Sequence, residues 1–430
     1  MCGILYSHDS QSFSDLTVLK KRGPEGFCEV SNDLGYFFHS MLNTIGDVTQ
    51  QPLTNKHGLL LYNGSTYNSK NQNDAKWIVD RLDNNLDNTI EIIQNLNGEY
   101  ALIYVTDTHI VFCVDPFDQR NLWFFHDSYH KQFTASSVPT VVKQKHVTSW
   151  RAEGNKIYVI NRNDYSVDIK VNRNFNLEQK HNHFDYVIEN FEQAVQNRYD
   201  PSISINLLSS GFDSGVIACA TNKFFDKVYC VGDPAKELKT VLQDRILLHD
   251  AILVPNYVGD QIEKMQMFHD LISKNDVWDD PLVNSLCNII KECILKKNKK
   301  VVITGNGGDE IYNDWHGQKH ELEWSKTNSY FASALELLWP WHNFKGRSML
   351  ACTRMDFICG YFGLESRNPL YDINLVQSWL NTTTQLKNKG YKSWMKHYMD
   401  QENYPYSMTK CHWGYDEYNP ESWKLHERKI

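Results

Sequence analysis

Two short glycine-rich stretches in the second half of the chain each follow a run of apolar residues. LLSSGFDSG spans 207–215, and VVITGNGGDE spans 301–310. In each, an apolar strand turns through small residues toward a helix, with Asp213 or Asp309 behind the turn. Strands that alternate with helices form parallel sheets, whose ligands bind beyond the carboxyl ends of the strands. The two stretches therefore predict two loops at one edge of a parallel sheet.

The chemistry of these loops depends on small residues and acids. Small residues let backbone N–H groups approach an anion, and the helix N-terminus favours negative charge. Asp213 would repel a bare phosphate, so its presence suggests a bridging Mg²⁺, which Asp309 would share over a pyrophosphate. The alternative for the first loop is a plain turn in which Asp213 caps the helix. It is not a Walker loop, because no Gly-Lys-Ser/Thr follows.

The first half has a different periodicity, with short apolar runs separated by Asn, Asp and Gly. These runs predict strands at 58–63, 100–106, 109–115, 121–126 and 156–161. A helix is predicted in AKWIVDRLDNN (75–85), where Trp77, Ile78 and Leu82 fit one apolar face. The first half therefore reads as a sheet-rich α+β domain.

The boundary between the halves is predicted within 161–183, a polar and irregular stretch. A clear amphipathic helix follows, with apolar residues at helical spacing: Phe184, Val187, Ile188, Phe191, Ala194 and Val195. We therefore expect one domain over 1–170, a linker over 171–183 and a second domain over 184–430.

Composition excludes several classes of protein. A chain of 430 residues with 41% hydrophobic and 22% charged residues suggests two globular domains. The net charge of −8 and the lack of long Lys/Arg runs argue against a nucleic-acid partner, and no stretch is long enough to span a membrane. Ten cysteines without a CxxC pair read as reduced thiols, which predicts a cytoplasmic protein.

The chain opens with MCGILYSHD, which places Cys2 directly after the initiator methionine. Removal of Met1 would leave a thiol and a free α-amine on one residue, and such an amine can activate its own side-chain nucleophile. The alternative is that Cys2 simply begins a buried edge strand. These residues alone leave both possibilities open.

Together these motifs resemble the asparagine synthetase family, in which a glutaminase domain with an N-terminal nucleophile is joined to a pyrophosphate-loop synthetase domain. SSGFDSG and TGNGGDE resemble its two ATP loops, and the segment LESRNPLYD (364–372) resembles its late E-x-R-x-P segment. The motifs that resemble its glutaminase half are MCGI, RGPEG (22–26), NGSTYN (63–68), LNGEYALI (96–103) and DPFDQRNLWFF (115–125). The resemblance implies an α+β N-terminal-nucleophile hydrolase-like domain followed by an α/β parallel-sheet domain.

The resemblance also implies roles for individual residues. Cys2 would attack a side-chain amide, and Asn63 and Gly64 would form the oxyanion hole. Mg²⁺ would bind Asp213 and Asp309, and a carboxylate would attack the α-phosphate of ATP. The nucleotide would lie against Leu207, Ser209, Gly211, Asp213, Ser214, Val231, Thr304 and Gly305.

Several positions depart from the family's pattern. HSMLN (39–43) has Met41 where relatives have an arginine that grips the glutamine α-carboxylate, and Ser65 replaces a glutamate that helps receive the α-amine. Asp74 could still serve that amine. Asn306 stands where asparagine-forming relatives have a glutamate. In KCHWGY (410–415), Lys410 is favoured over His412 as the late basic residue.

The expected function is therefore ATP-dependent amidation of a carboxylate with ammonia from glutamine, in which asparagine is one possible product. One alternative is a ligase that accepts ammonia or an amine because its glutaminase is impaired. Another, of a different class, is a nucleotide-binding regulatory protein. The expected partners are small molecules alone, apart from a possible second copy of the chain, and the expected cofactors are ATP and Mg²⁺.

Overall fold

A computed structural model describes residues 1–9, 15–44, 46–69, 72–127, 129, 132–139, 147–232, 239–249, 251–254, 286–287, 289–312, 331, 333–335 and 349–407. The chain divides into two compact units, and each is described by itself. Unit 1 comprises Met1–Asn176 and the described residues of Trp339–Arg367. Unit 2 comprises the described residues of Leu177–Met265, Val277–Leu338 and Asn368–Ile430. The predicted second domain of 184–430 thus includes a late segment that groups with the first half.

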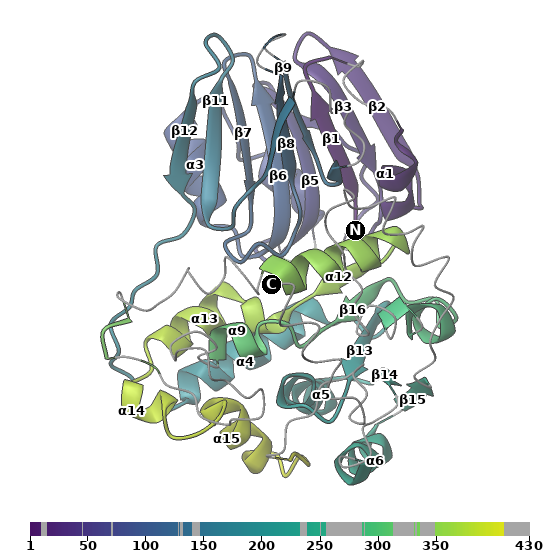
Figure 1. The fold of residues 1–430 in the computed structure, drawn as a ribbon, viewed down its shortest axis with the longest axis vertical. Coiled ribbons are helices and arrows are strands. Elements are labelled where there is room, and N and C mark those ends of the chain that lie inside the picture. Colours follow the sequence, from purple (N-terminus) through teal and green to yellow (C-terminus); the bar gives the residue numbers. More distant parts are fainter. Residues whose placement is uncertain are drawn as a thin grey trace. The chain divides into compact units, whose positions relative to one another are not determined.

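Unit 1 contains two six-stranded antiparallel sheets (Figure 1). The first has the order β10 (Val147–Arg151), β8 (Trp123–Asp127), β9 (Gln132–Ser136), β1 (Gly3–Ser7), β3 (Gly35–Ser40) and β2 (Phe27–Asn32). The second has the order β12 (Val167–Val171), β11 (Lys156–Asn161), β7 (His109–Val114), β6 (Gly98–Thr106), β5 (Gly58–Thr66) and β4 (Leu53–Thr54). The predicted sheet-rich first half is confirmed, and β1, which follows Cys2, is an interior strand and not an edge strand.

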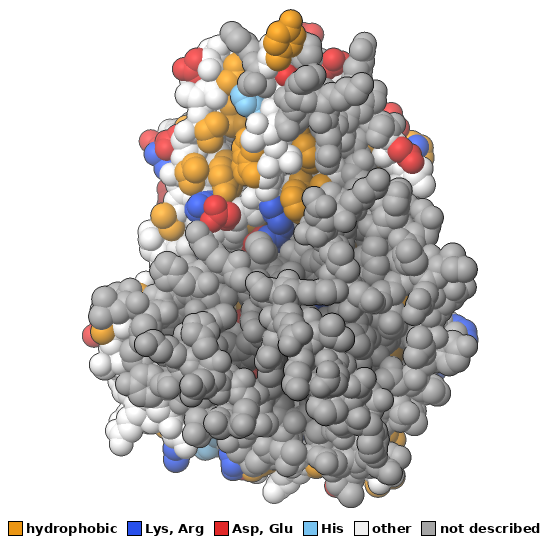
Figure 2. All heavy atoms as spheres, in the orientation of Figure 1, with side chains coloured by type: hydrophobic (Ala, Val, Ile, Leu, Met, Phe, Trp, Pro, Cys, Tyr) orange, Lys and Arg blue, Asp and Glu red, His pale blue; other side chains and the backbone are white. Residues whose placement is uncertain are grey.

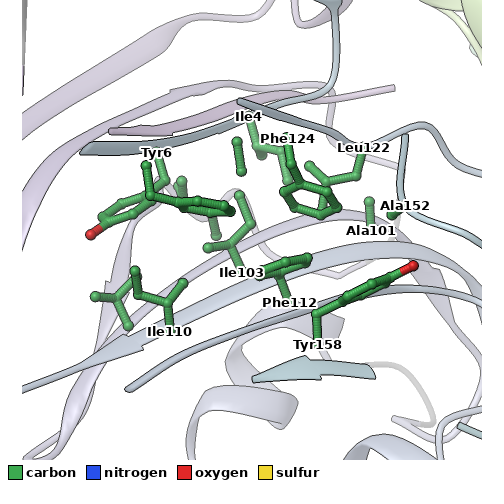
Figure 3. Close-up of a cluster of buried hydrophobic side chains, with 14 of the residues drawn as sticks. Ile4, Tyr6, Ala101, Ile103, Ile110, Phe112, Leu122, Phe124, Ala152 and Tyr158 are labelled. Atoms are coloured by element: carbon green, nitrogen blue, oxygen red, sulfur yellow. The ribbon is translucent and has the colours of Figure 1, made fainter. Parts of the chain in front are cut away.

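Side chains from both sheets meet in a core that includes Tyr6, Phe112 and Phe124 (Figure 3). Because successive residues of a strand face opposite sides, the alternate residues of β5 and β6 lie in a second core with helices α2 (Asp74–Val79) and α3 (Leu86–Gln94). Asn73 caps α2 by accepting a hydrogen bond from the backbone of Lys76. The predicted helix over 75–85 is therefore shorter, and a second helix begins at Leu86.

The prediction that 161–183 is irregular is wrong at its start, because β12 pairs with β11 there. Val167, Ile169 and Val171 alternate with Asp168 and Lys170, which is the period of a strand. The three apolar side chains are 50%, 50% and 49% exposed, so the strand buries little and its composition resembles that of a loop. Hydrophobic side chains are visible over this part of unit 1 in Figure 2.

The remaining elements of unit 1 are helices α1 (Thr17–Arg22) and α12 (Met349–Tyr361) and the short strand β17 (Glu365–Arg367). Helix α1 packs against β1 and β3, and α12 packs against α1. Residues from the late part of the chain therefore take part in the environment of the N-terminus.

Unit 2 contains parallel strands in the order β15 (Ala251–Val254), β14 (Tyr229–Gly232), β13 (Ser204–Leu208) and β16 (Val301–Ile303). The parallel sheet predicted for the second half is confirmed. The helices and helical turns are α4 (Asp185–Arg198), α5 (Phe212–Phe224), α6 (Lys239–Leu248), η3 (Ile290–Ile294), α9 (Gly308–Tyr312), η5 (Pro369–Tyr371), α13 (Ile373–Leu380), α14 (Thr384–Lys387) and α15 (Ser393–Gln401). Helix α4 confirms the predicted amphipathic helix and buries Val187, Phe191, Ala194 and Val195.

The strand order positions the two glycine-rich loops. From β13 the chain moves to β14 and β15 on one side, and β16 then lies on the other side of β13. The carboxyl ends of β13 and β16 therefore flank the point where the strand order reverses, which is the usual ligand-binding crevice of such sheets. Both predicted loops begin there.

Candidate functional site

Cys2 lies immediately before β1 in unit 1 and is half-buried. Its Sγ is 3.8 Å from the backbone oxygen of Leu42. Burial raises the pKa of the thiol, and the nearby positive α-amine opposes this rise. In this chain the α-amine belongs to Met1, donates to the backbone oxygen of Leu364 at 2.6 Å, and has its pKa lowered to about 5 by burial. The thiol is therefore predominantly protonated while Met1 is in place.

Arg22 connects Cys2 to helix α12. Its Nε donates to the backbone oxygen of Cys2 at 3.1 Å, and its Nη2 pairs with the Asp356 carboxylate at 3.0 Å. Both side chains are fully buried, and Asn121 also donates to Asp356 at 2.8 Å. This network, which sequence reasoning did not assign, fixes the backbone of the candidate nucleophile.

Asn63 and Gly64 lie in β5, opposite Ala101 and Tyr100 of β6. Asn63 is fully buried, yet within the described part of the chain neither its side-chain nitrogen nor its oxygen has a hydrogen-bond partner. Buried polar groups are normally satisfied, so an unsatisfied amide is a candidate for contact with a ligand. The oxyanion-hole role of Asn63 and Gly64 stays a prediction.

Asp74 is buried at the start of α2, where it accepts hydrogen bonds from the backbone N–H groups of Thr66 and Ala75. Burial, followed by the negative charge of Glu365, raises the pKa of Asp74 to about 7. Asp74 and Glu365 also raise the pKa of Cys2, so the three side chains share one electrostatic environment.

A buried ion pair occupies the neighbourhood of Ser65. Arg367 Nε lies 2.7 Å from Glu365 Oε1, and Ser65 donates to the same carboxylate oxygen at 2.8 Å. Arg367 Nη2 also lies 3.3 Å from Ser65 Oγ. Burial alone would raise the pKa of Glu365, but the guanidinium groups of Arg367 and Arg120 lower it to about 2. Sequence reasoning noted segment 364–372 only as part of the second half and missed this contact.

In unit 2 the two predicted acids meet on one lysine. Lys392 Nζ contacts a carboxylate oxygen of Asp213 and lies 2.7 Å from Asp309 Oδ1. Lys392 is 1% exposed, and the carboxylates attract its proton so strongly that its pKa rises although burial opposes this. Tyr391 donates to Asp309 at 3.3 Å. The two acids therefore lie at the same edge of the sheet.

The two loops also pack directly against each other. A Cβ atom added to Gly305 would lie 2.8 Å from Asp213 Cβ, and one added to Gly308 would lie 2.1 Å from Asp213 Oδ1. Only glycine allows this approach. The N-cap of α5 is Gly211, and Asp213 lies in the first turn of the helix.

The other predicted nucleotide-binding residues lie around the same edge. Ser209 Oγ lies 2.8 Å from Ser214 Oγ and accepts a hydrogen bond from the backbone N–H of Gly211 at 3.1 Å. Leu207 and Val231 lie in adjacent strands, where Leu207 pairs with Cys230 and Val231 pairs with Leu208.

The second loop carries one satisfied and one unsatisfied side chain. Thr304 donates to the side-chain oxygen of Asn368 at 2.5 Å and accepts from the backbone N–H of Asn306. The Asn306 side-chain nitrogen is buried without a partner among the described residues. Later in the same segment, burial and the charge of Asp309 raise the pKa of Glu310 to about 7.

Lys392 was missed by sequence reasoning, which favoured Lys410 over His412 as the late basic residue. Both Lys410 and His412 lie outside the described residues. Lys392 has a φ of 45°, in the left-handed region, directly before α15. Such a conformation is unusual for a residue with a side chain and is often found at functional sites. The sequence GYKSW carries no local pattern that reveals it.

The acid pair fits a magnesium ion. Mg²⁺ in nucleotide sites is usually held by one or two carboxylates together with phosphate oxygens and water. Asp213 and Asp309 supply two such carboxylates, and their contact with one ammonium group shows that they converge on a single positive charge. Among the described residues, no cluster of three or more His, Cys, Asp or Glu could hold a metal.

Comparisons with known proteins add little to this geometry. No protein-family model matches the chain, and no curated protein matches its sequence. One similar solved structure is titled as the allosteric regulatory enzyme of purine biosynthesis, with 12% identity, 70% of this chain and 80% of that chain covered, and a TM-score of 0.35. Another is the glutamine phosphoribosylpyrophosphate amidotransferase from B. subtilis, with 13% identity, coverage of 82% and 92%, and a TM-score of 0.34.

Within the described residues, no helix has both the length and the apolar character needed to cross a membrane.

Proposed function

We propose that the protein is an asparagine synthetase-like amidotransferase, which activates a carboxylate with ATP and amidates it with ammonia from glutamine. The observation that carries the proposal is the convergence of Asp213 and Asp309 on Lys392 beside a loop of small residues. Carboxylates repel an anion unless a cation joins the two, and Mg²⁺ joins one or two carboxylates to substrate phosphates in this way.

In unit 2, a carboxylate oxygen of the substrate would attack the α-phosphorus of ATP, and the bond to the β-phosphate would break. Pyrophosphate would leave with the electron pair of that bond, which produces an acyl-adenylate. Bound Mg²⁺, held by Asp213 and Asp309, would neutralise charge on the phosphates. The role of Lys392 would be to keep the two carboxylates together and to stabilise negative charge that develops beside them. Ammonia would then attack the acyl carbon and displace AMP.

In unit 1, Cys2 would cleave the carboxamide of glutamine once Met1 has been removed. The freed α-amine would accept the thiol proton, the sulfur would attack the amide carbon, and ammonia would leave after protonation. Water would then hydrolyse the thioester to glutamate. Asn63, whose buried amide has no partner among the described residues, would donate to the oxyanion.

The proposal is tested by incubating the protein with ATP, Mg²⁺, a panel of carboxylates and either glutamine or ammonia, while pyrophosphate release is followed. We expect carboxylate-dependent pyrophosphate release that Asp309→Asn abolishes, and ammonia-supported turnover that Cys2→Ala leaves intact. Mass spectrometry of the purified protein would show in parallel whether Met1 is removed and whether a glutamine-like thiol trap acylates Cys2. Binding of ATP without pyrophosphate release across the panel would instead favour the regulatory alternative.

A second candidate is a ligase that uses ammonia or an amine without a working glutaminase. It is favoured by the surroundings of Cys2, where Met41 is buried and the Glu365–Arg367 pair lies against Ser65. Arg367 already pairs with the carboxylate of Glu365, so it does not replace the arginine that would bind the α-carboxylate of free glutamine. Glutamate release that depends on Cys2 would exclude this candidate.

A further inference from the structure

We propose that Arg245 of helix α6 is a buried counter-charge for the phosphates that the loop after β13 binds, and that it also positions this loop. The inference rests on the nucleotide-binding part of the proposed function and names a residue outside the predicted site. The inference is based on the contacts that the Arg245 side chain makes with the backbone of this loop.

The guanidinium group of Arg245 is fully buried, and it donates hydrogen bonds to backbone oxygens of the loop. Its Nη1 donates to the backbone oxygen of Ser209 and, at 2.9 Å, to that of Gly211. Its Nε donates to the backbone oxygen of Pro405 at 3.0 Å. One side chain therefore joins the first glycine-rich loop to a segment much later in the chain.

These hydrogen bonds orient the loop. In a trans peptide the carbonyl and the following N–H point in opposite directions. Because the Ser209 and Gly211 carbonyls point toward Arg245, the N–H groups of Ser210 and Phe212 point toward the opposite side. That orientation suits an anion at the amino end of α5, where the helix dipole already favours negative charge.

Among the described residues, no carboxylate balances the charge of Arg245, whose guanidinium instead contacts backbone oxygens and lies 5.2 Å from the centre of the Tyr404 ring. In the described part of the chain, Arg245 Nη2 has no hydrogen-bond partner. Burial lowers the pKa of the guanidinium, which shows that the charge is destabilised where it lies. By contrast, the buried Arg198 of the same unit pairs with Asp372 at 2.8 Å.

Hydrogen bonds to carbonyl groups do not neutralise a charge, and a buried charge without an anionic partner is costly, so the site suggests a missing anion. The phosphates of a nucleotide on the far side of the loop would supply that anion through a medium of low dielectric constant, in which charges act over longer distances. Arg245 would touch no phosphate, and so it acts through the loop as a positioning residue and through its field as a counter-charge.

Gly215 of helix α5 packs directly against this group. A Cβ atom added to Gly215 would lie 2.3 Å from Arg245 Nη2 and 2.7 Å from Cζ. Gly215→Ala would therefore displace the guanidinium while leaving its charge in the protein. Gly215→Ala therefore tests whether ATP binding depends on where the positive charge lies, whereas Arg245→Met tests whether it depends on the charge at all.

The test compares the dissociation constants of Mg²⁺–ATP and of adenosine by titration calorimetry. Arg245→Met should weaken ATP binding at least tenfold and change adenosine binding less than twofold, because adenosine carries no phosphate. Arg245→Lys, which keeps the charge, should retain most of the preference for ATP. Gly215→Ala should lose part of the preference for ATP over adenosine. Arg198→Met is the matched control, and it should lower the melting temperature without changing the preference.

The outcomes separate this inference from the proposed function. Wild-type protein that binds no ATP would overturn the proposed ligase and the counter-charge together. Wild-type protein that prefers ATP, with an unchanged preference in folded Arg245→Met, would overturn the counter-charge alone. Equal losses of ATP and adenosine would also overturn it, since they indicate a purely structural role. If Arg245→Met does not fold, the other two variants decide: a wild-type preference for ATP in Gly215→Ala, or loss of the preference in Arg245→Lys, would overturn the counter-charge.

Discussion

The candidate sites of the two units handle buried charge in different ways. In unit 1, Glu365 and Arg367 are each 3% exposed and neutralise one another. In unit 2, two carboxylates share one lysine, and Asp213 and Asp309 are 24% and 18% exposed. The first arrangement is complete without a ligand, whereas the second keeps an excess of negative charge within reach of solvent. This difference indicates that unit 2 is the stronger candidate for a site that recruits a cation and a nucleotide.

The two units also differ in the kind of evidence that supports each half of the proposed reaction. For unit 2, two loops and a lysine converge on a single point. For unit 1, the charges of Asp74 and Glu365 raise the pKa of Cys2, but the Cys2 nitrogen lies in the peptide bond to Met1 and would become a free amine only when Met1 is removed. The largest expected effects in the two units are therefore of different kinds, on catalysis in unit 2 and on stability in unit 1.

The largest effect is expected from Asp213→Asn or Asp309→Asn, because each removes a carboxylate from the cation site. Loss of metal-assisted charge stabilisation costs several kcal/mol, so pyrophosphate release should fall by about 10³-fold. A continuous pyrophosphate assay measures this. Asp400→Asn is the matched control on the surface of α15, and it should change the rate less than twofold. If Asp309→Asn kept a rate within tenfold of wild type, unit 2 would no longer be the stronger candidate for a cation and nucleotide site.

Arg367→Met should have a large effect on stability, because it leaves Glu365 buried without its partner. Removal of one member of a buried pair costs about 3–5 kcal/mol, measured as the free energy of unfolding in urea. Glu365→Gln with Arg367→Met should recover part of this loss, since no unpaired charge remains.

The sign of the acid response follows from the pKa of Glu365. Its folded value of about 2 lies below the ordinary 4.5, so the pair's stabilisation is present above pH 4.5 and is lost as the pH falls toward 2. In Arg367→Met this acid sensitivity should be weaker. An unchanged acid response would show that the pair contributes little.

Lys392→Met should have a smaller effect on stability, of about 1–3 kcal/mol, because solvent reaches the two carboxylates that it leaves behind. Millimolar Mg²⁺ should then raise the melting temperature of the variant more than that of wild type, since the metal replaces the missing positive charge. A thermal-shift titration compares them. Equal stabilisation of both proteins by Mg²⁺ would mean that the acid pair is not the metal site.

The smallest effect concerns the pH dependence of glutamine hydrolysis. Because the pKa of Asp74 is raised to about 7, its carboxyl group is protonated below that pH and can balance an ammonium group only above it. The kcat/KM for glutamine should therefore rise through pH 7, and Asp74→Asn should remove the rise and lower the value at pH 8 about tenfold. Asp80→Asn, near the end of the same helix, should keep the wild-type profile.

The sequence predicted the parts of the molecule whose signals are local. The strands that were predicted are marked by apolar runs, and the two loops by small residues with an acid a few positions behind them. Asp213 and Asp309 could be placed together because parallel strands bring their carboxyl ends to one edge. Strand β12 was missed because its apolar side chains are half-exposed and alternate with charged residues.

The residues that complete the sites could not be predicted in this way. Lys392, Arg245 and Glu365 reach their contacts only through the tertiary fold, from segments distant in sequence. The left-handed backbone at Lys392 leaves no trace in the residue type, since lysine is not favoured there. Charge complementarity acts through space, and a single sequence gives no record of which charges will meet.

The most direct test of the central claim is calorimetric titration of Mg²⁺–ATP into the wild-type protein and into the Asp213→Asn/Asp309→Asn double variant. We expect wild type to bind one nucleotide per chain and the double variant to bind at least tenfold more weakly. Equal affinity in the two proteins, or no binding by wild type, would contradict the proposed cation and nucleotide site.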